Sequence, residues 1–216
     1  MRKQFQEQMT DLKRSLIEMG GFIEYAIDTA VKALIKQDIA AAARAIEFDE
    51  VIDQKEREIE DACMRLLIQQ QPVAGDLRKI SAALKIITDM ERIGDQSADI
   101  SEITLLLGKD PYIKELKHTR LMAEAAISMV HKAVDAYVRE DTDLAEEVIR
   151  SDDIVDGYFI EIREELCGLI QKNVKNVHQA FDFMMIAKYL ERIGDHATNI
   201  AEWVMYSITG SHPREA

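Results

Sequence analysis

The sequence predicts an all-α protein, and three observations support that prediction. Gly and Pro are sparse, at 9 and 3 of 216 residues, so long segments contain no residue that would break a helix. Apolar residues recur at alternating steps of four and three, the heptad spacing of helices that pack along a seam. No segment shows sustained alternation of apolar and polar residues, which a half-buried strand would require. We expect six long helices.

The first half of the chain is expected to hold three of them. The first helix follows a seam of apolar positions, which are Phe5, Met9, Leu12, Leu16, Met19, Ile23, Ala26, Ala30 and Ala33. Asp38 is expected to cap the second helix, which covers about residues 38–71 and ends before Pro72. Asp76 is expected to cap the third helix, which ends near Gly108.

The second half is expected to repeat this order. Asp110 followed by Pro111 matches an N-cap with proline at the first helical position, so the fourth helix is expected to begin there. Arg120 interrupts the apolar seam of that helix, and the pattern offers no reason for it. Asp141 is expected to open the fifth helix, and a polar break at residues 173–176 separates it from the sixth.

Short loops make sequential helices antiparallel neighbours, so two tandem three-helix bundles are the simplest architecture. The predicted domains are residues 1–109 for the first bundle and residues 110–216 for the second. The last helix is expected to stop near Gly210, and the tail at residues 211–216 is expected to fray.

One thirteen-residue motif occurs twice. Residues 90–102 read MERIGDQSADISE and residues 190–202 read LERIGDHATNIAE, and seven of the thirteen aligned positions are identical. At about 100° per residue, one face of each helix then carries a row of acids within about 80°. The rows are Glu91, Asp95, Asp99 and Glu102, and, with one asparagine, Glu191, Asp195, Asn199 and Glu202. Like charges in a row cost a helix roughly several tenths of a kcal/mol per pair, and a bound cation would offset that cost.

Pairs of aspartates occupy matching places in the second and fifth helices, where Asp152 and Asp156 repeat Asp49 and Asp53 at an offset of 103. If each pair faces the acidic row of the following helix, four or more carboxylates converge in each bundle. Carboxylate oxygens suit Mg²⁺, Ca²⁺, Mn²⁺ or Fe³⁺. The predicted metal ligands are Asp49, Asp53, Glu91, Asp95 and Asp99 in the first bundle, and Asp152, Asp156, Glu191, Asp195 and Asn199 in the second.

An acidic row of this kind can also be a solvated helix face that binds no metal. Such faces are common, and Arg92 and Arg192 could neutralise these charges locally. Gly94 and Gly194 each cost about 1 kcal/mol relative to Ala inside a helix. We expect them to permit the close approach of a neighbouring helix, and a gap for a ligand is the alternative.

The composition and net charge of the chain exclude some classes of function. Forty acidic and 27 basic residues give a net charge of −13, which argues against a nucleic-acid partner because phosphate binding needs clustered Lys and Arg. No secretory signal opens the chain and no run of about 18 apolar residues occurs, so we expect a cytoplasmic protein without membrane insertion. Cys63 and Cys167 are expected to be buried small hydrophobic residues, with a disulfide or a thiolate site as the alternative.

Catalysis has little support in the sequence. A ferritin-like di-iron site needs Glu-x-x-His pairs, whereas Gly94 and Gly194 stand three residues after Glu91 and Glu191. No glycine-rich phosphate loop or nucleophile constellation is present. We therefore expect a protein that is not an enzyme. The alternative is a metal-dependent hydrolase or oxidase that uses the carboxylates and an open coordination position.

At these motifs the chain resembles the PhoU family, helix by helix over essentially its whole length. The repeated Glu-x-x-x-Asp motifs, Glu91 with Asp95 and Glu191 with Asp195, have matched aspartate pairs in the preceding helices, and GDHATNIAE at residues 194–202 is the most specific piece. The resemblance implies two three-helix bundles, a homodimer, and iron, zinc, manganese or magnesium on the acidic motifs.

The resemblance also implies a cytoplasmic regulator of phosphate uptake. Such a protein would restrain the phosphate-starvation response and link the ATPase subunit of the phosphate ABC transporter to a phosphate-sensing histidine kinase. The two halves differ at two motif positions, because Asn199 replaces the carboxylate of Asp99 and His196 replaces Gln96. We expect the two sites to differ in affinity or in metal.

Overall fold

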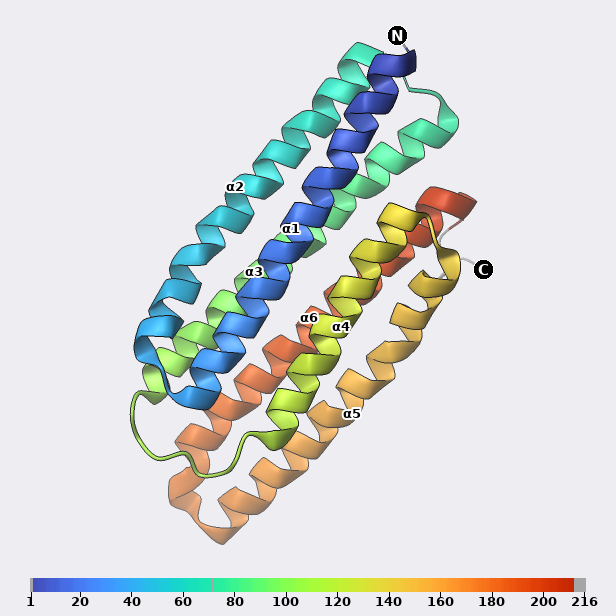
Figure 1. The fold of residues 1–216 in the computed structure, drawn as a ribbon. Helices are drawn as coiled ribbons and strands as arrows, with labels where there is room; N and C mark the ends of the chain where they lie inside the picture. Colours follow the sequence, from blue (N-terminus) through green and yellow to red (C-terminus); the bar gives the residue numbers. More distant parts are fainter. Residues whose placement is uncertain (1, 71, 212–216) are drawn as a thin grey trace.

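The computed structural model describes residues 2–70 and 72–211, and within these ranges it contains six α-helices, one short 3₁₀-helix and no strand. The elements are α1 (Arg2–Lys36), α2 (Ile39–Gln70), α3 (Ala74–Leu107), α4 (Lys117–Arg139), α5 (Thr142–Lys172), η1 (Val174–Asn176) and α6 (Val177–Thr209). Figure 1 shows two three-helix bundles lying side by side, with all six helices along one long axis. The predicted all-α class is confirmed.

The two bundles meet mainly along α3 and α6, and α1 and α4 form a second contact between them. The colours in Figure 1 show that α3 and α6 run in opposite directions. Because α3 and α6 carry the two copies of the repeated motif, the motifs lie against each other at the centre of the molecule.

The apolar seam of α1 is buried from Leu12 to Ala33, as its spacing predicted, and Phe5 and Met9 pack at its edge. Burial of one large aliphatic side chain contributes about 1.5–3 kcal/mol, so this seam is a major source of stability. One hydrophobic core continues from the first bundle into the second. The division into domains at residues 109 and 110 therefore stays a prediction.

Arg120 does not enter the seam of α4. Its side chain is 64% exposed and its guanidinium pairs with Glu124, one turn later, at 2.9 Å. The arginine therefore points away from the core, which explains how the seam accommodates it.

Two predicted helix caps are confirmed. The carboxylates of Asp38 and Asp141 each accept a hydrogen bond from the backbone N–H three residues later, at 2.9 and 3.0 Å. Gly108 and Gly210 end α3 and α6 with φ of 59° and 81°, values that few residues other than glycine adopt. The cap predicted for α3 is wrong, because Val73 occupies that position and Asp76 lies inside the first turn.

The predicted start of α4 is also wrong, since α4 begins at Lys117 and not after Asp110. The segment before it is held by tertiary contacts. The hydroxyl of Tyr112 donates a hydrogen bond to the carbonyl of Leu34 at 2.9 Å, and its ring packs edge-on against Phe183 with 5.1 Å between centroids. These contacts with α1 and α6 outweigh the local preference of an Asp-Pro pair for starting a helix.

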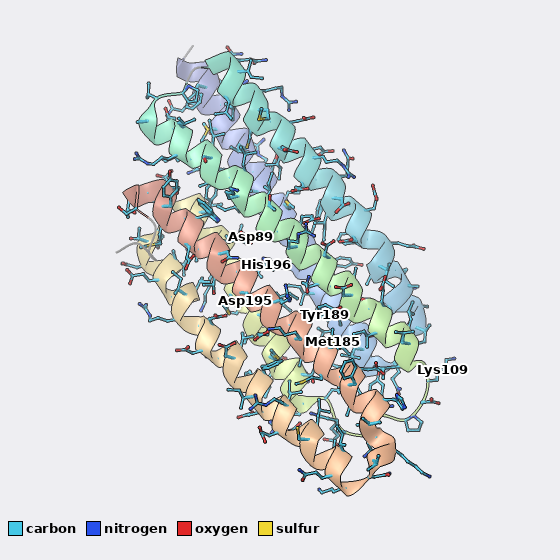
Figure 2. The ribbon with its side chains drawn as sticks, turned by 180° about the vertical axis from the view of Figure 1, so that it is seen from behind. Asp89, Lys109, Met185, Tyr189, Asp195 and His196 are labelled. Atoms are coloured by element: carbon cyan, nitrogen blue, oxygen red, sulfur yellow. The ribbon has the colours of Figure 1, made fainter. Side chains whose placement is uncertain are left out.

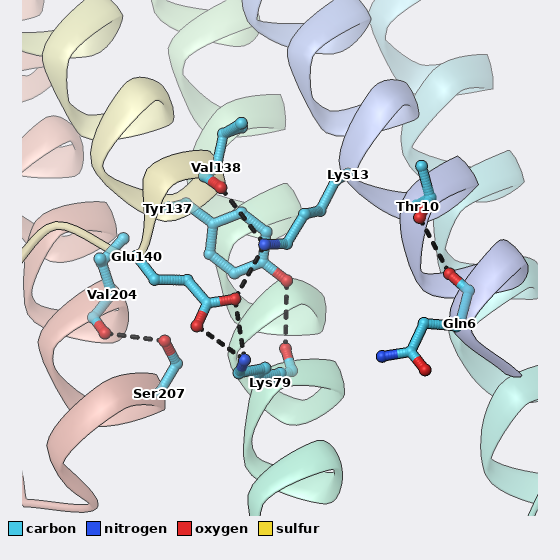
Figure 3. Close-up of polar contacts among 9 residues, drawn as sticks. All are labelled: Gln6, Thr10, Lys13, Lys79, Tyr137, Val138, Glu140, Val204 and Ser207. Carbon is cyan, nitrogen blue, oxygen red and sulfur yellow. Dashed lines mark hydrogen bonds and ion pairs between the residues drawn. The ribbon is translucent and has the colours of Figure 1, made fainter. Parts of the chain in front are cut away.

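A charged cluster joins the bundles at the turn between α4 and α5. Glu140 has a left-handed backbone conformation, and its carboxylate accepts hydrogen bonds from Lys13 of α1 and Lys79 of α3, each at 2.8 Å (Figure 3). Tyr137 donates from its hydroxyl to the carbonyl of Lys79 at 3.3 Å. The turn of the second bundle is thus fastened to two helices of the first.

Cys63 is buried as expected, and burial raises the pKa of its thiol to about 12. The same expectation is wrong for Cys167, which is exposed on α5, and both thiols are free.

Among the described residues, no helix has the length and apolar character needed to cross a membrane. Residue 71, where we expected the second helix to end, and residues 212–216 of the tail lie outside the described residues.

Candidate metal-binding sites

In the first bundle, the acidic side chains of α2 face those of α3. Burial raises the pKa of Asp49 to about 6, and the charges of Asp95, Asp53 and Asp99 add to the increase. The charge of one carboxylate raises the pKa of another in this way only when the two lie close together. Helices α2 and α3 therefore bring four of the predicted ligands together.

Glu91 belongs to the same group. Burial is the main cause that raises its pKa to about 7, followed by the charge of Asp95, while Arg92 opposes the increase. Glu56 and Asp53 contribute further increases. Glu56 was not among the predicted ligands, although its place three residues after Asp53 puts it on the same helix face. We call this group the first carboxylate set: Asp49, Asp53, Glu56, Glu91, Asp95 and Asp99.

Gly94 allows α2 to approach α3 at this set, as predicted. A Cβ atom at residue 94 would lie 2.9 Å from Oδ1 of Asp49 and 3.0 Å from Cδ1 of Ile52. That Asp49 oxygen is buried, and within the described residues it has no hydrogen-bond partner. A buried carboxylate oxygen without a donor is costly, and a bound cation would satisfy it. The donor set therefore fits a hard metal ion.

The arginine of the first motif neutralises part of this charge. Arg92 pairs with Asp95 at 2.8 Å and with Glu91 at 3.4 Å, and its side chain is 56% exposed. Arg57 lies 3.8 Å from Asp53. Exposed pairs of this kind contribute about 0–1 kcal/mol. The expectation of local neutralisation is thus met for Arg92, at the outer edge of the set.

The second bundle has the same arrangement. Burial raises the pKa of Asp152 to about 6, with further increases from Asp156 and Asp195. A Cβ atom at Gly194 would lie 3.1 Å from Oδ1 of Asp152 and 3.3 Å from Cγ1 of Val155. Glycine again permits the close approach of two helices. We call this group the second carboxylate set: Asp152, Asp156, Glu191 and Asp195.

A lysine lies within the second set. The ammonium of Lys188 forms an ion pair with Glu191, one turn later on α6. It also lies 5.7 Å from the ring centroid of Phe159 on α5, a cation–π contact. Burial, followed by the charge of Glu191, raises the pKa of Asp195 above the usual value of an aspartate, and the charge of Lys188 opposes this increase.

Asn199 lies at the contact between the bundles. Its Nδ2 donates a hydrogen bond to Oδ1 of Asp89 on α3 at 3.2 Å, and Nδ1 of His196 lies 2.8 Å from the same oxygen. Figure 2 shows Asp89 and His196 beside each other between α3 and α6. The amide nitrogen of Asn199 is thus hydrogen-bonded to Asp89. The repeated motif does not indicate this contact, because Asp89 lies just before its first copy.

Asp99 of the first bundle makes the equivalent contact with the second bundle. It is hydrogen-bonded to Tyr189 of α6, and Tyr189 and Asp89 occupy equivalent positions of the two copies, as do Asp99 and Asn199. Unlike Asn199, Asp99 also adds to the pKa increase of Asp49, so it belongs both to the contact between the bundles and to the first carboxylate set.

Within the described part of the chain, no three His, Cys, Asp or Glu side chains already stand in the arrangement of a metal site. Binding of one ion by three of these carboxylates would therefore require rotation of side chains toward a common point.

Comparisons with known proteins identify the family of this chain. Residues 16–104 and 119–204 each match the family model described as the PhoU domain. The chain belongs to the PhoU family. The two matched segments of this PhoU-family chain contain α2 and α5 and most of α3 and α6, and so include both carboxylate sets.

Similar relatives and structures cover almost the whole chain. One is the phosphate-specific transport system accessory protein PhoU homolog of Clostridium acetobutylicum, 39% identical over 210 residues, with 97% of this chain and 96% of that protein covered. A crystal structure of PhoU from Pseudomonas aeruginosa matches with a TM-score of 0.91 at 34% identity, covering 96% of this chain and all of that chain. The phosphate transport system regulatory protein PhoU from Streptococcus pneumoniae matches with a TM-score of 0.90 at 26% identity, with 96% and 98% covered.

Proposed function

We propose that this protein is a metal-binding regulatory adaptor of phosphate uptake, which acts in the cytoplasm through protein partners and not by catalysis. The similarity to proteins named as accessory and regulatory components of phosphate transport supports the phosphate-related role. The partners we propose are the ATPase subunit of a phosphate ABC transporter and a phosphate-sensing histidine kinase, and the protein would act as a homodimer that restrains the phosphate-starvation response.

The observation that carries the metal-binding part is the buried, unpartnered oxygen of Asp49 beside Gly94. The first carboxylate set would hold an ion between α2 and α3, and the second set would hold one between α5 and α6. All-oxygen donors favour manganese, magnesium or iron over zinc, which prefers nitrogen and sulfur ligands. The ion would supply positive charge that relieves the repulsion among the carboxylates.

Metal binding is tested by elemental analysis and calorimetric titration of the purified protein and of Asp95→Ala and Asp195→Ala. Each substitution is expected to reduce the uptake of metal by one of the two sets. Asp61→Ala removes an exposed acid of α2 outside the set and serves as the control. Equal uptake by all four proteins would contradict the assignment of the sites.

The adaptor role is tested by binding of the purified protein to the cognate transporter ATPase and to the cognate kinase, with and without metal. We expect a complex with at least one of them, and derepression of phosphate-starvation genes when the protein is deleted. Absence of both complexes, together with normal repression in the deletion strain, would exclude phosphate signalling and leave metal storage.

A further inference from the structure

The two carboxylate sets differ at several positions outside the repeated motif. Glu56 of α2 has Phe159 as its counterpart in α5, at the same offset of 103 residues that relates the aspartate pairs. Thr88 of α3 has Lys188 as its counterpart in α6, at the offset of 100 residues that relates the motifs. The first set thus gains an acid, and the second set gains a cation.

Glu56 is placed to act with the first set. It is half-buried on α2, one turn after Asp53, and burial is the main cause that raises its pKa, followed by the charges of Glu60 and Asp53. Its own charge in turn raises the pKa of Glu91 on α3. Glu56 therefore lies on the same face of α2 as Asp53, one turn further along the helix.

Lys188 takes the opposite role in the second set. Its ammonium pairs with Glu191 and lies over the ring of Phe159, at 5.7 Å from the centroid. The ring fills the place where the first set has Glu56, and its π face holds the ammonium beside the carboxylates. A metal ion entering the second set has to displace this resident charge from Glu191.

One arginine also differs between the sets, because Arg57 lies 3.8 Å from Asp53 and has Ile160 as its counterpart. Arg57 is 51% exposed and pairs more closely with Glu50, at 3.0 Å, so it lies at the outer edge of the first set. Arg92, which pairs with Glu91 and Asp95, has Arg192 as its counterpart in the second motif. Both halves therefore carry an arginine at this motif position, whereas Glu56, Arg57 and Lys188 are each present in only one half.

On the basis of the proposed metal binding, we propose that Glu56 is an additional ligand of the first set and that Lys188 is a built-in counter-ion of the second set. The two bundles then bind hard divalent cations with unequal affinity, and the first bundle fills before the second. Phe159 acts as a positioning residue, because it holds the Lys188 ammonium without touching the ion.

The test is a calorimetric titration of the metal-free protein with Mn²⁺. We expect a tighter and a weaker phase, which Asp49→Asn and Asp152→Asn assign to the first and second set. Glu56→Gln is expected to weaken the tighter phase about tenfold, the size of effect that lost supporting groups have on metal sites. Lys188→Met keeps the apolar stem over Phe159 and is expected to tighten the weaker phase by a similar factor of about ten.

The reciprocal substitution Thr88→Lys places a lysine at the equivalent exposed position of the first set, and it is expected to weaken the tighter phase. Lys175→Met removes the same charge from η1, thirteen residues before Lys188, and is expected to leave both phases unchanged. Circular dichroism of each variant establishes that the helices are intact.

The outcomes separate this inference from the proposed function. Two equal phases in the wild type, or a Lys175→Met effect as large as that of Lys188→Met, would overturn the asymmetry and leave metal binding in place. No uptake of Mn²⁺ or of Fe³⁺ by the wild type would overturn the proposed metal binding itself, and the asymmetry with it.

Discussion

Gly94 of α3 faces the carboxylate of Asp49 on α2 so closely that a Cβ atom at residue 94 would lie 2.9 Å from Oδ1 of the aspartate. The contact places an acidic group against a neighbouring helix without a hydrogen-bond donor among the described residues. Gly194 and Asp152 repeat the close approach in the second bundle, at 3.1 Å. The glycines are therefore part of the geometry of the carboxylate sets.

Replacement of Gly94 by alanine is expected to lower the free energy of unfolding by about 1–3 kcal/mol, because the new methyl group overpacks the contact with Asp49 and Ile52. The measurement is chemical denaturation. Gly157→Ala on α5 is the matched control, since its Cβ would meet no atom within 4 Å. The control should gain up to about 1 kcal/mol from helix propensity. Equal stabilisation by both substitutions would show that the close approach is unimportant.

The carboxylate sets predict a pH dependence of stability for the metal-free protein. Burial and neighbouring acids raise the pKa of Asp49 and Asp152 to about 6 and that of Glu91 to about 7. The folded state then binds more protons than the unfolded state above about pH 4, so the contribution of these groups falls as pH rises from about 4 to 7. Asp49→Asn should flatten this decline in the melting temperature. An unchanged pH profile in the variant would contradict the raised pKa.

Added Mn²⁺ is expected to raise the melting temperature more at about pH 7.5 than at about pH 5, because protonated carboxylates bind cations weakly. Thermal melts with the metal and with excess chelator measure this difference. A variant that carries both Asp49→Asn and Asp152→Asn should lose most of the metal-induced increase, and an undiminished increase would mean that the ion binds elsewhere.

The cluster of Glu140 with Lys13 and Lys79 is expected to stabilise the contact between the bundles. Glu140→Gln should lower the free energy of unfolding by about 0.5–1.5 kcal/mol, because partly buried charge-assisted hydrogen bonds are lost. The two lysines lower the pKa of Glu140 from 4.5, so its contribution is present above pH 4.5 and is lost as pH falls through the lowered value. Glu7→Gln, at an exposed pair 4.0 Å long, is the control and should have little effect.

The contact of Asn199 with Asp89 predicts a structural role for this asparagine. Asn199→Ala should lower the free energy of unfolding by about 1–2 kcal/mol, since it leaves one lone pair of a half-buried carboxylate without its donor. Denaturation and metal titration of the same variant distinguish the two roles. A lower Mn²⁺ stoichiometry with normal stability would instead support the predicted role of Asn199 as a ligand.

Much of the fold could be predicted because helix formation depends on local spacing. The seam from Leu12 to Ala33 and the caps at Asp38 and Asp141 all follow from residues near one another in the chain. The facing of the aspartate pairs and the acidic rows also followed, because short loops leave consecutive helices few ways to pack. Where α4 begins did not follow, since Tyr112 bonds to α1 and packs on α6, far away in the sequence.

The sequence by itself determined that this chain forms six helices in two related halves, that each half carries an aspartate pair and an acidic row on successive helices, and that both halves resemble one family. These features are repeated within the chain, so one copy supported the interpretation of the other. Only the tertiary structure decided that Asn199 binds Asp89, that Glu56 joins the first set, and that Lys188 lies over Phe159 beside Glu191. The physical reason is that these contacts depend on the relative rotation and axial position of packed helices, which many side chains set together.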